Sequence, residues 1–496
     1  MGSSPIWLAG GPVRDLLMGR HPKDWDFVVT EGAIPIARSC ADALGGAFYA
    51  LDVGRGTGRA IVQPPISSGH KPSGGSVSLD FAELRGATLG EDLQLRDFTI
   101  NAMAMTLEGE LIDPTGGLGD LAAKRIRLTY SGSLRADPVR LLRAVRFVVE
   151  LGFVLSTEMH RHIAQQAGAL HEAAAERIRD EMLKILALQG SAQGYRLLSE
   201  LGLLDHVLPR ELTESPVPGE TDTHAGAEAR QVSTVRVLQM LEAVVTRIRG
   251  APEVSTRTDH NKAMLDAVSA AAQAYMVDLA TYLDRDLSAI ATRQQLMPWC
   301  ALFSELIDNN ATVRDGQTGP ERTQLPQRAQ GDSAAAVADL AMTSLRFSAK
   351  AREFVATVLR ESSQFAVLRD SNRDRRACHR YFRDTGDAGV AIALLALAQQ
   401  CVCAPTVQEP PVDYDSLETA RCIFRTYFRL YDKVVAPPPL LTGHDLMEMG
   451  LSQGPTIGRV LMRLREAQAA GEISTKAQAQ DRAQQMVREA ARLPSP

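Results

Sequence analysis

Two aspartates one residue apart, Asp24 and Asp26, are the residues of this sequence best suited to chemistry. They lie in the run DWDFVV, residues 24–29, whose aromatic and β-branched composition predicts a strand. Alternate residues of a strand point to the same face, so we expect the two carboxylates side by side. Carboxylates that close repel each other unless a cation lies between them, and oxygen ligands suit Mg²⁺ bridging to phosphates. The alternative is an exposed, acidic strand end.

A glycine pair comes shortly before these aspartates. Gly10 and Gly11 follow the apolar run IWLA, and Pro12 opens a helix-like segment that Gly19 is placed to end. The free N–H groups and the dipole at a helix start attract anions. A plain tight turn would have the same residues, but the nearby carboxylate pair favours a phosphate site.

A third acidic candidate is Asp80, in the strand-like run SVSLDFAEL at residues 76–84. A charge flanked by apolar residues in a sheet is costly unless it is paired, and a metal would supply the partner. Glu83 and Asp92 are competing candidates for the same role.

The elements that must position these residues change character along the chain. Up to about residue 130, short β-branched runs alternate with glycine-rich turns, which predicts an α+β domain; from about residue 134 the pattern is helical. Polar stretches at 64–76, 212–230 and 308–334 are predicted to be loops or linkers. With 496 residues, the chain should hold two to four domains.

Composition limits the class of protein. A hydrophobic fraction of 45% is ordinary for a soluble protein, and the net charge of -5 argues against nonspecific coating of nucleic acid. The six cysteines have no zinc-ligand spacing and are expected to be reduced thiols. The most apolar run, residues 389–398, is too short to span a membrane, and no signal peptide is evident, so we expect a cytoplasmic location.

Five segments, in order, resemble the motifs of bacterial class II tRNA nucleotidyltransferases. That family contains the CCA-adding enzymes and the bacterial poly(A) polymerases. The segments are GGPVRDLLMGRHPKDWDF (10–27), RDFTINAMA (96–104), IDPTGGLGDL (112–121), DPVRLLRAVRFVVELGF (137–153) and ERIRDEMLKIL (176–186). Residues 440–474 resemble the C-terminal segment of members with an additional helical domain.

The resemblance implies a polymerase β-like nucleotidyltransferase head followed by an all-α remainder. We expect the head at 1–130, a neck for nucleobase selection and RNA binding at 131–210, a helical body at 211–430 and a helical tail at 431–496.

The resemblance also implies a reaction and its site residues. The 3′-hydroxyl of a tRNA would attack a nucleoside triphosphate, CTP or ATP, and pyrophosphate would leave, with two Mg²⁺ ions held by Asp24 and Asp26. Asp80 is the third candidate ligand, on the ground of its charge within a strand. No membrane or DNA partner is expected. The implied nucleotide-binding residues are Gly10, Gly11, Arg14, Arg96, Asp97, Asp137, Arg140 and Arg143.

Base selection without a template has a physical basis in the segment 137–153, which we expect to be one helix with Asp137, Arg140 and Arg143 along one flank. A carboxylate accepts from an exocyclic amino group while a guanidinium donates to the neighbouring ring nitrogen, an arrangement that suits cytosine and adenine. Uracil and guanine would meet mismatched polar groups. The alternative is an exposed helix face with ordinary ion pairs.

Two positions depart from the family pattern. Many members have Glu before Asp137 and Arg before Arg96, where this chain has Ala136 and Leu95. The sequence favours CCA addition but leaves open addition of A alone and poly(A) synthesis on RNA 3′ ends. A catalytically silent RNA-binding protein is disfavoured, because it has no need for a repelling carboxylate pair.

The middle region resembles an HD-type metal domain that has lost its ligands. Ser233, Ser304, Glu305 and Asp332 occupy positions where ligating His or Asp is expected. Serine is a poor ligand for the metals of such sites. We therefore expect retained helices without the metal chemistry.

Overall fold

The computed structural model describes residues 5–22, 24–63, 76–209, 223–251, 259–311, 327–403 and 413–490. The predicted loop at 64–76 lies outside the described residues except for residue 76. The loops predicted at 212–230 and 308–334 are too long, because α12 (Thr223–Ile248) begins inside the first, and α15 (Arg293–Ala311) and α16 (Gln327–Ser344) extend into the second. The start of α12, residues 223–230, contains three alanines, and alanine is the strongest helix former, which outweighs the polarity of this segment.

The chain divides into two compact units. The first comprises residues 1–181 and 197–206, and the second comprises residues 182–196 and 207–496.

The first unit contains a seven-stranded mixed sheet of order β3-β4-β5-β2-β1-β6-β7, which confirms the predicted α+β class. Its strands are β1 (Ile6–Ala9), β2 (Asp24–Val29), β3 (Ala47–Asp52), β4 (Thr57–Val62), β5 (Val77–Glu83), β6 (Ala104–Met105) and β7 (Leu111–Ile112). The pair β2 and β5 is parallel, and the other neighbouring strands are antiparallel.

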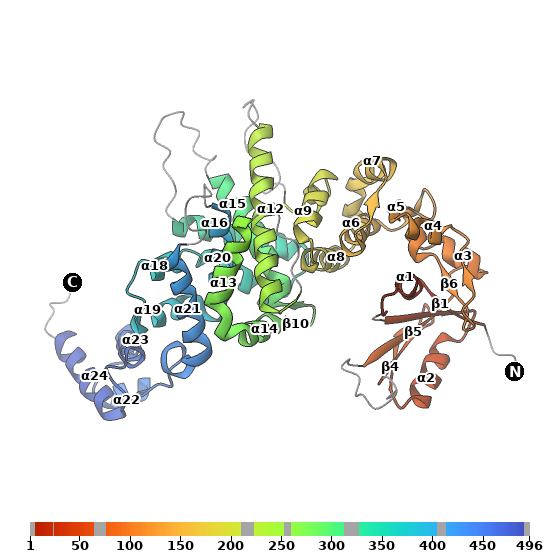
Figure 1. Cartoon of the computed structure of the whole chain (residues 1–496). Coiled ribbons are helices and arrows are strands. Elements are labelled where there is room, and N and C mark those ends of the chain that lie inside the picture. The colour runs from red at the N-terminus through yellow and green to blue at the C-terminus, as the bar shows by residue number, and fades with distance from the viewer. Residues whose placement is uncertain are drawn as a thin grey trace. The chain divides into compact units, whose positions relative to one another are not determined.

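The two faces of this sheet have different roles. Helix α2 (Ala33–Ala43) packs on the face that carries Phe27 and Phe81, whose rings stack with centroids 5.0 Å apart. Strand alternation puts Asp24, Asp26 and the buried Val28 on the opposite face. Helix α1 (Gly11–Leu17) follows β1 directly, and Figure 1 shows α1 and α2 on different sides of the sheet. The carboxylate pair therefore faces away from α2.

Helices make up most of the remainder of the first unit. They include α3 (Leu89–Gln94), the short 3₁₀ helix η1 (Thr99–Asn101), α4 (Gly117–Ala122), α5 (Ser133–Ala136), α6 (Arg140–Leu151), α7 (Thr157–Gln166), α8 (Ala175–Ala187), α9 (Ser191–Glu200) and α10 (Leu204–Val207). The last turns of α8 and the first of α9 belong to the second unit.

The helix predicted over 137–153 starts later than expected. Asp137 has extended backbone angles, φ −151° and ψ 96°, and α6 begins only at Arg140. The cause is Pro138, because a residue before proline is disfavoured in the helical region. Asp137 therefore lies in the connection between α5 and α6, and not on the helix flank with Arg140 and Arg143.

The described part of the second unit is helical apart from the short strands β10 (Asp286–Ser288) and β11 (Ala291–Thr292). Its other helices are α13 (Asp259–Ala272), α14 (Met276–Asp284), α17 (Ala349–Arg360), α18 (Gln364–Arg369), α19 (Arg375–Thr385), α20 (Gly389–Cys403), α21 (Tyr414–Arg429), α22 (Gly443–Glu448), α23 (Pro455–Ala470) and α24 (Lys476–Ala490). Among the described residues, no helix has the length and apolarity needed to cross a membrane.

Candidate active site

Three predicted carboxylates lie together on the sheet. Asp24 and Asp26 are alternate residues of β2, and Asp26 is the register partner of Asp80 on the parallel strand β5. Burial, together with the negative charges of Asp80 and Asp24, raises the pKa of Asp26 to about 6. A carboxylate held in this way is stabilised by any cation that binds beside it.

Arg59 on β4 joins the cluster formed by Asp24, Asp26 and Asp80, and the sequence did not predict this contact. Its Nε and Nη2 donate to the two carboxylate oxygens of Asp80, both at 2.6 Å. The competing candidates have other partners: Glu83 accepts from the Gly32 N–H at 2.9 Å, and Asp92 accepts from Arg96. The antiparallel register of β4 and β5 sets Arg59 opposite Asp80, and this register cannot be read from either strand alone.

The donor set fits Mg²⁺ at the Asp24 and Asp26 end of the cluster. Both side chains offer hard oxygens, and the raised pKa of Asp26 marks a negative charge that lacks sufficient neutralisation. Asp80 already shares two hydrogen bonds with a guanidinium. Within the described ranges, no three His, Cys, Asp or Glu side chains form a preassembled metal-binding group. Asp80 is therefore paired with Arg59, and Asp24 and Asp26 remain the predicted ligands.

The glycine turn lies beside Arg96. Gly10 has a φ of +84°, and a Cβ added there would lie 2.6 Å from Nη1 of Arg96. Nε and Nη2 of Arg96 donate to Asp92 Oδ2, both at 3.1 Å, which holds the side chain in place. The turn therefore needs glycine, and it presents a guanidinium nitrogen next to the start of α1, where an anion would bind.

Arg14, Asp97 and Arg143 belong to one internal network. Arg14 Nη1 donates to Asn101 Oδ1 at 2.8 Å, and Asn101 Nδ2 donates to Asp97 Oδ1 at 3.1 Å. Arg143 Nη2 lies 2.6 Å from Asp97 Oδ2, and the Phe98 N–H donates to Asp97 at 2.8 Å. Burial alone would raise the pKa of Asp97, but Arg143 and these donors hold it below its ordinary value.

This network changes the interpretation of the three residues. Arg14 and Asp97 are buried, and both side chains bond to neighbours within the fold. Their role in nucleotide binding stays a prediction. In this structure they tie α1, η1 and α6 to one another, which positions the glycine turn.

Asp137 has a partner that the sequence did not indicate. Arg177 on α8 donates from Nη1 to Asp137 Oδ1 at 2.9 Å and from Nη2 to Oδ2 at 2.8 Å. Nε of Arg140 is farther away, at 4.0 Å from Asp137 Oδ2. Arg177 is part of the motif ERIRDEM, but nothing in that motif shows which carboxylate it meets.

The residues of the HD-like region converge in the second unit. The Ser233 hydroxyl donates to Glu305 Oε2 at 2.5 Å, and Gln399 Nε2 donates to Ser304 Oγ at 3.2 Å and to Glu305 Oε1 at 3.1 Å. Asp332 has a different neighbour, with its Oδ1 lying 3.7 Å from Nε of Arg360. Three of the four predicted positions therefore share one hydrogen-bonded cluster.

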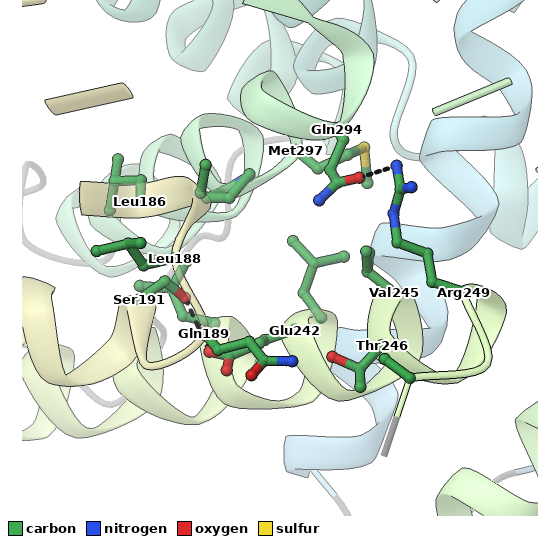
Figure 2. A pocket seen from close by; sticks show the side chains of 15 residues that line it. Leu186, Leu188, Gln189, Ser191, Glu242, Val245, Thr246, Arg249, Gln294 and Met297 are labelled. Atoms are coloured by element: carbon green, nitrogen blue, oxygen red, sulfur yellow. Dashed lines mark hydrogen bonds between the residues drawn. The ribbon is translucent and has the colours of Figure 1, made fainter. Parts of the chain in front are cut away.

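The second unit also contains a cavity of about 110 Å³ lined by the α8–α9 connection, α12 and α15 (Figure 2). Its Glu242 carboxylate accepts from the Gly190 N–H at 2.7 Å and from Ser191 Oγ at 3.2 Å. Burial raises the pKa of Glu242. This carboxylate fixes the start of α9, and none of the predicted site residues lines the cavity.

Two family descriptions match the chain. The Poly A polymerase head domain matches residues 6–127, and the probable RNA and SrmB-binding site of polymerase A matches residues 152–213. The first match covers the sheet with its carboxylates, and the second covers α7 to α10.

Similar proteins span much of the chain. The A-adding tRNA nucleotidyltransferase of Deinococcus radiodurans is 29% identical over 95% of this chain and 93% of that protein. The CC-adding tRNA nucleotidyltransferase of Geobacter sulfurreducens is 37% identical over 51% of this chain and 56% of that protein. The solved apo form I of a CCA-adding enzyme, 17% identical, covers 98% of this chain and 90% of its own with a TM-score of 0.58, and shows the fold.

Proposed function

We propose that the chain belongs to the family of bacterial tRNA nucleotidyltransferases and poly(A) polymerases and, on this premise, that it adds CMP and AMP to the 3′ end of tRNA. The observation that carries the proposal is the face of the sheet on which Asp24 and Asp26 lie side by side. The glycine turn and Arg96 add an anion site in the same unit.

Different residues of the chain would serve different parts of the phosphoryl transfer. The turn at Gly10 lets a triphosphate approach the start of α1, and Arg96 would neutralise part of its charge. Asp24 and Asp26 would hold Mg²⁺, which supplies neutralisation of the phosphate oxygens during the reaction. The bound RNA would provide the attacking 3′-hydroxyl, and pyrophosphate would leave.

Base selection belongs to the connection between α5 and α6. Asp137 is partly exposed, and its carboxylate can accept from the exocyclic amino group of cytosine or adenine. Uracil and guanine present a carbonyl at that position and would be repelled. The same proposal assigns residues 1–130 to the head, 131–210 to the neck, 211–430 to the body and 431–496 to the tail. The body and tail would bind tRNA, and the protein would act in the cytoplasm.

The decisive experiment offers the full chain tRNA transcripts that end before C74, C75 or A76, in the tRNA's own numbering, with each labelled nucleoside triphosphate. Stepwise addition of C, C and A supports the proposal. Addition of A only to the transcript ending in C75 would instead match the Deinococcus radiodurans relative, which is named as A-adding. Long A tails would indicate a poly(A) polymerase, and no incorporation would indicate a silent RNA-binding protein.

The HD-like region is expected to show no metal-dependent hydrolysis. A site of that type needs several imidazoles and carboxylates on one or two metals, whereas Ser233, Ser304 and Gln399 surround Glu305 with hydroxyl and amide groups. The measurement is hydrolysis of a 2′,3′-cyclic phosphate with Ni²⁺, Co²⁺ or Mn²⁺. Hydrolysis that persists after Asp24→Ala and Asp26→Ala would contradict this prediction.

A further inference from the structure

The Asp137–Arg177 pair joins one of the predicted base-selecting residues to a side chain on α8. Both terminal nitrogens of Arg177 donate to Asp137, one to each oxygen, at 2.9 and 2.8 Å. Two parallel hydrogen bonds from a planar guanidinium fix the plane of the carboxylate as well as its position. The preceding residue, Ala136, offers no second carboxylate for Arg177.

Arg140 does not orient Asp137 in this structure. Its Nη1 donates to Ser133 Oγ at 2.7 Å and its Nη2 donates to the Leu95 carbonyl at 2.9 Å. Only 9% of its side chain is exposed. Arg140 therefore ties the start of α6 to the segment that carries Arg96, and leaves the orientation of Asp137 to Arg177.

The pair can be reached from solvent. The side chains of Asp137 and Arg177 are 24% and 54% exposed. A carboxylate has about four acceptor positions, of which Arg177 takes one on each oxygen. The remaining lone pairs can accept hydrogens from an amino group without loss of the bonds to Arg177.

We propose that Arg177 is a specificity-determining residue that positions Asp137 for the choice of a nucleobase with an exocyclic amino group. The inference rests on the proposed function. Without Arg177, the carboxylate can rotate, and a uracil carbonyl no longer meets a fixed negative charge. Selection of cytosine over uracil should then weaken more than binding of the triphosphate, which depends on other residues.

The test compares Arg177→Ala and Arg177→Lys with the unmodified chain, by the ratio of kcat/KM for CTP and UTP on tRNA. A ratio is unaffected by the fraction of folded enzyme, so a purely structural loss would leave it unchanged. We expect Arg177→Ala to lower the ratio about 10- to 100-fold. Arg177→Lys should restore part of it, because an ammonium pairs with the carboxylate but cannot form the two-bond fork.

Arg125→Ala is the matched control. Arg125 is also about half exposed and pairs with a carboxylate of the same unit, Asp120, which keeps Arg127 as a second partner. The control should retain the CTP to UTP ratio. An unchanged ratio in Arg177→Ala would overturn the inference.

Equilibrium binding of CTP and UTP to the full chain, without tRNA, separates this inference from the proposed function. If the unmodified chain adds nothing to tRNA, the proposed function fails. Stronger binding of CTP than of UTP that disappears in Arg177→Ala would still support the role of Arg177. Equal effects of the substitution on both nucleotides would refute it.

Discussion

Replacing Asp26 with asparagine is expected to abolish nucleotide incorporation and to raise the thermal stability of the metal-free protein. The loss of activity should be about 10³-fold or more, equivalent to about 4 kcal/mol of transition-state stabilisation, because the amide cannot hold a divalent cation. Asparagine has nearly the shape of aspartate, so the fold and the binding of tRNA should be retained. Incorporation of labelled CMP or AMP measures the first effect.

The gain in stability follows from the pKa of Asp26. Burial, Asp80 and Asp24 raise it from 3.8 to about 6, so ionisation at neutral pH destabilises the folded protein by about 3 kcal/mol. The stability that protonated Asp26 contributes is complete below about pH 3.8 and is lost as the pH rises through about 6. The neutral amide avoids this loss, so melting in EDTA at pH 7.5 should occur at a higher temperature.

Added Mg²⁺ provides the contrasting condition. It should stabilise the unmodified protein more than Asp26→Asn, because only the former retains both carboxylates. Asp52→Asn is the control, since Asp52 lies on the exposed strand β3 with Arg55 as its surface partner. A fully active Asp26→Asn enzyme would contradict the assignment of this carboxylate to the reaction.

The sequence predicted those parts of the site that lie within one short segment. Alternation along 24–29 placed Asp24 and Asp26 on one face, and the turn before α1 was predictable because Gly10 can adopt the positive φ that the turn requires. Both depend on local backbone geometry. The α+β head and the helical remainder were predictable for the same reason, because hydrophobic periodicity is a local property.

Contacts between distant segments could not be predicted in this way. Arg59 meets Asp80 through the register of two strands, and Arg177 meets Asp137 across 40 residues. Arg59 gives Asp80 a partner other than a metal, and Arg177 orients the carboxylate of Asp137. The sequence identified the acidic residues because they are costly without partners, but it did not identify the partners themselves.

The late start of α6 shows how one residue overrides a helical pattern. Apolar spacing from 141 to 149 suggested that the helix included Asp137, and Pro138 removes Asp137 from it. In the extended backbone that results, Asp137 reaches Arg177 and does not line up with Arg140 and Arg143.

Replacing Asp97 with alanine is expected to cost the first unit about 3–5 kcal/mol of stability. The substitution leaves Arg143 without its carboxylate partner. It also removes the buried oxygen that accepts from the Asn101 side chain and from the Phe98 N–H. Arg14 should be held less firmly as well, because Asn101 is one of its two partners and only Asp15 remains unaffected. Urea unfolding followed by fluorescence measures the loss, since Trp7 and Trp25 lie in this unit.

Two measurements distinguish the loss of the ion pair from the loss of packing. They are the pH dependence of the stability of Asp97→Ala and the effect of a second substitution at Arg143. The pKa of Asp97 lies below its ordinary value, so its contribution is present above about pH 3.8 and is lost as the pH falls further. Asp97→Ala should therefore lose less stability than the unmodified protein on acidification below that value. Adding Arg143→Met to Asp97→Ala should restore part of the lost stability, because the unpaired guanidinium is then removed. If the double variant is as unstable as Asp97→Ala, the lost stability comes from packing. The charge of Asp97 would then not be what holds the network in place.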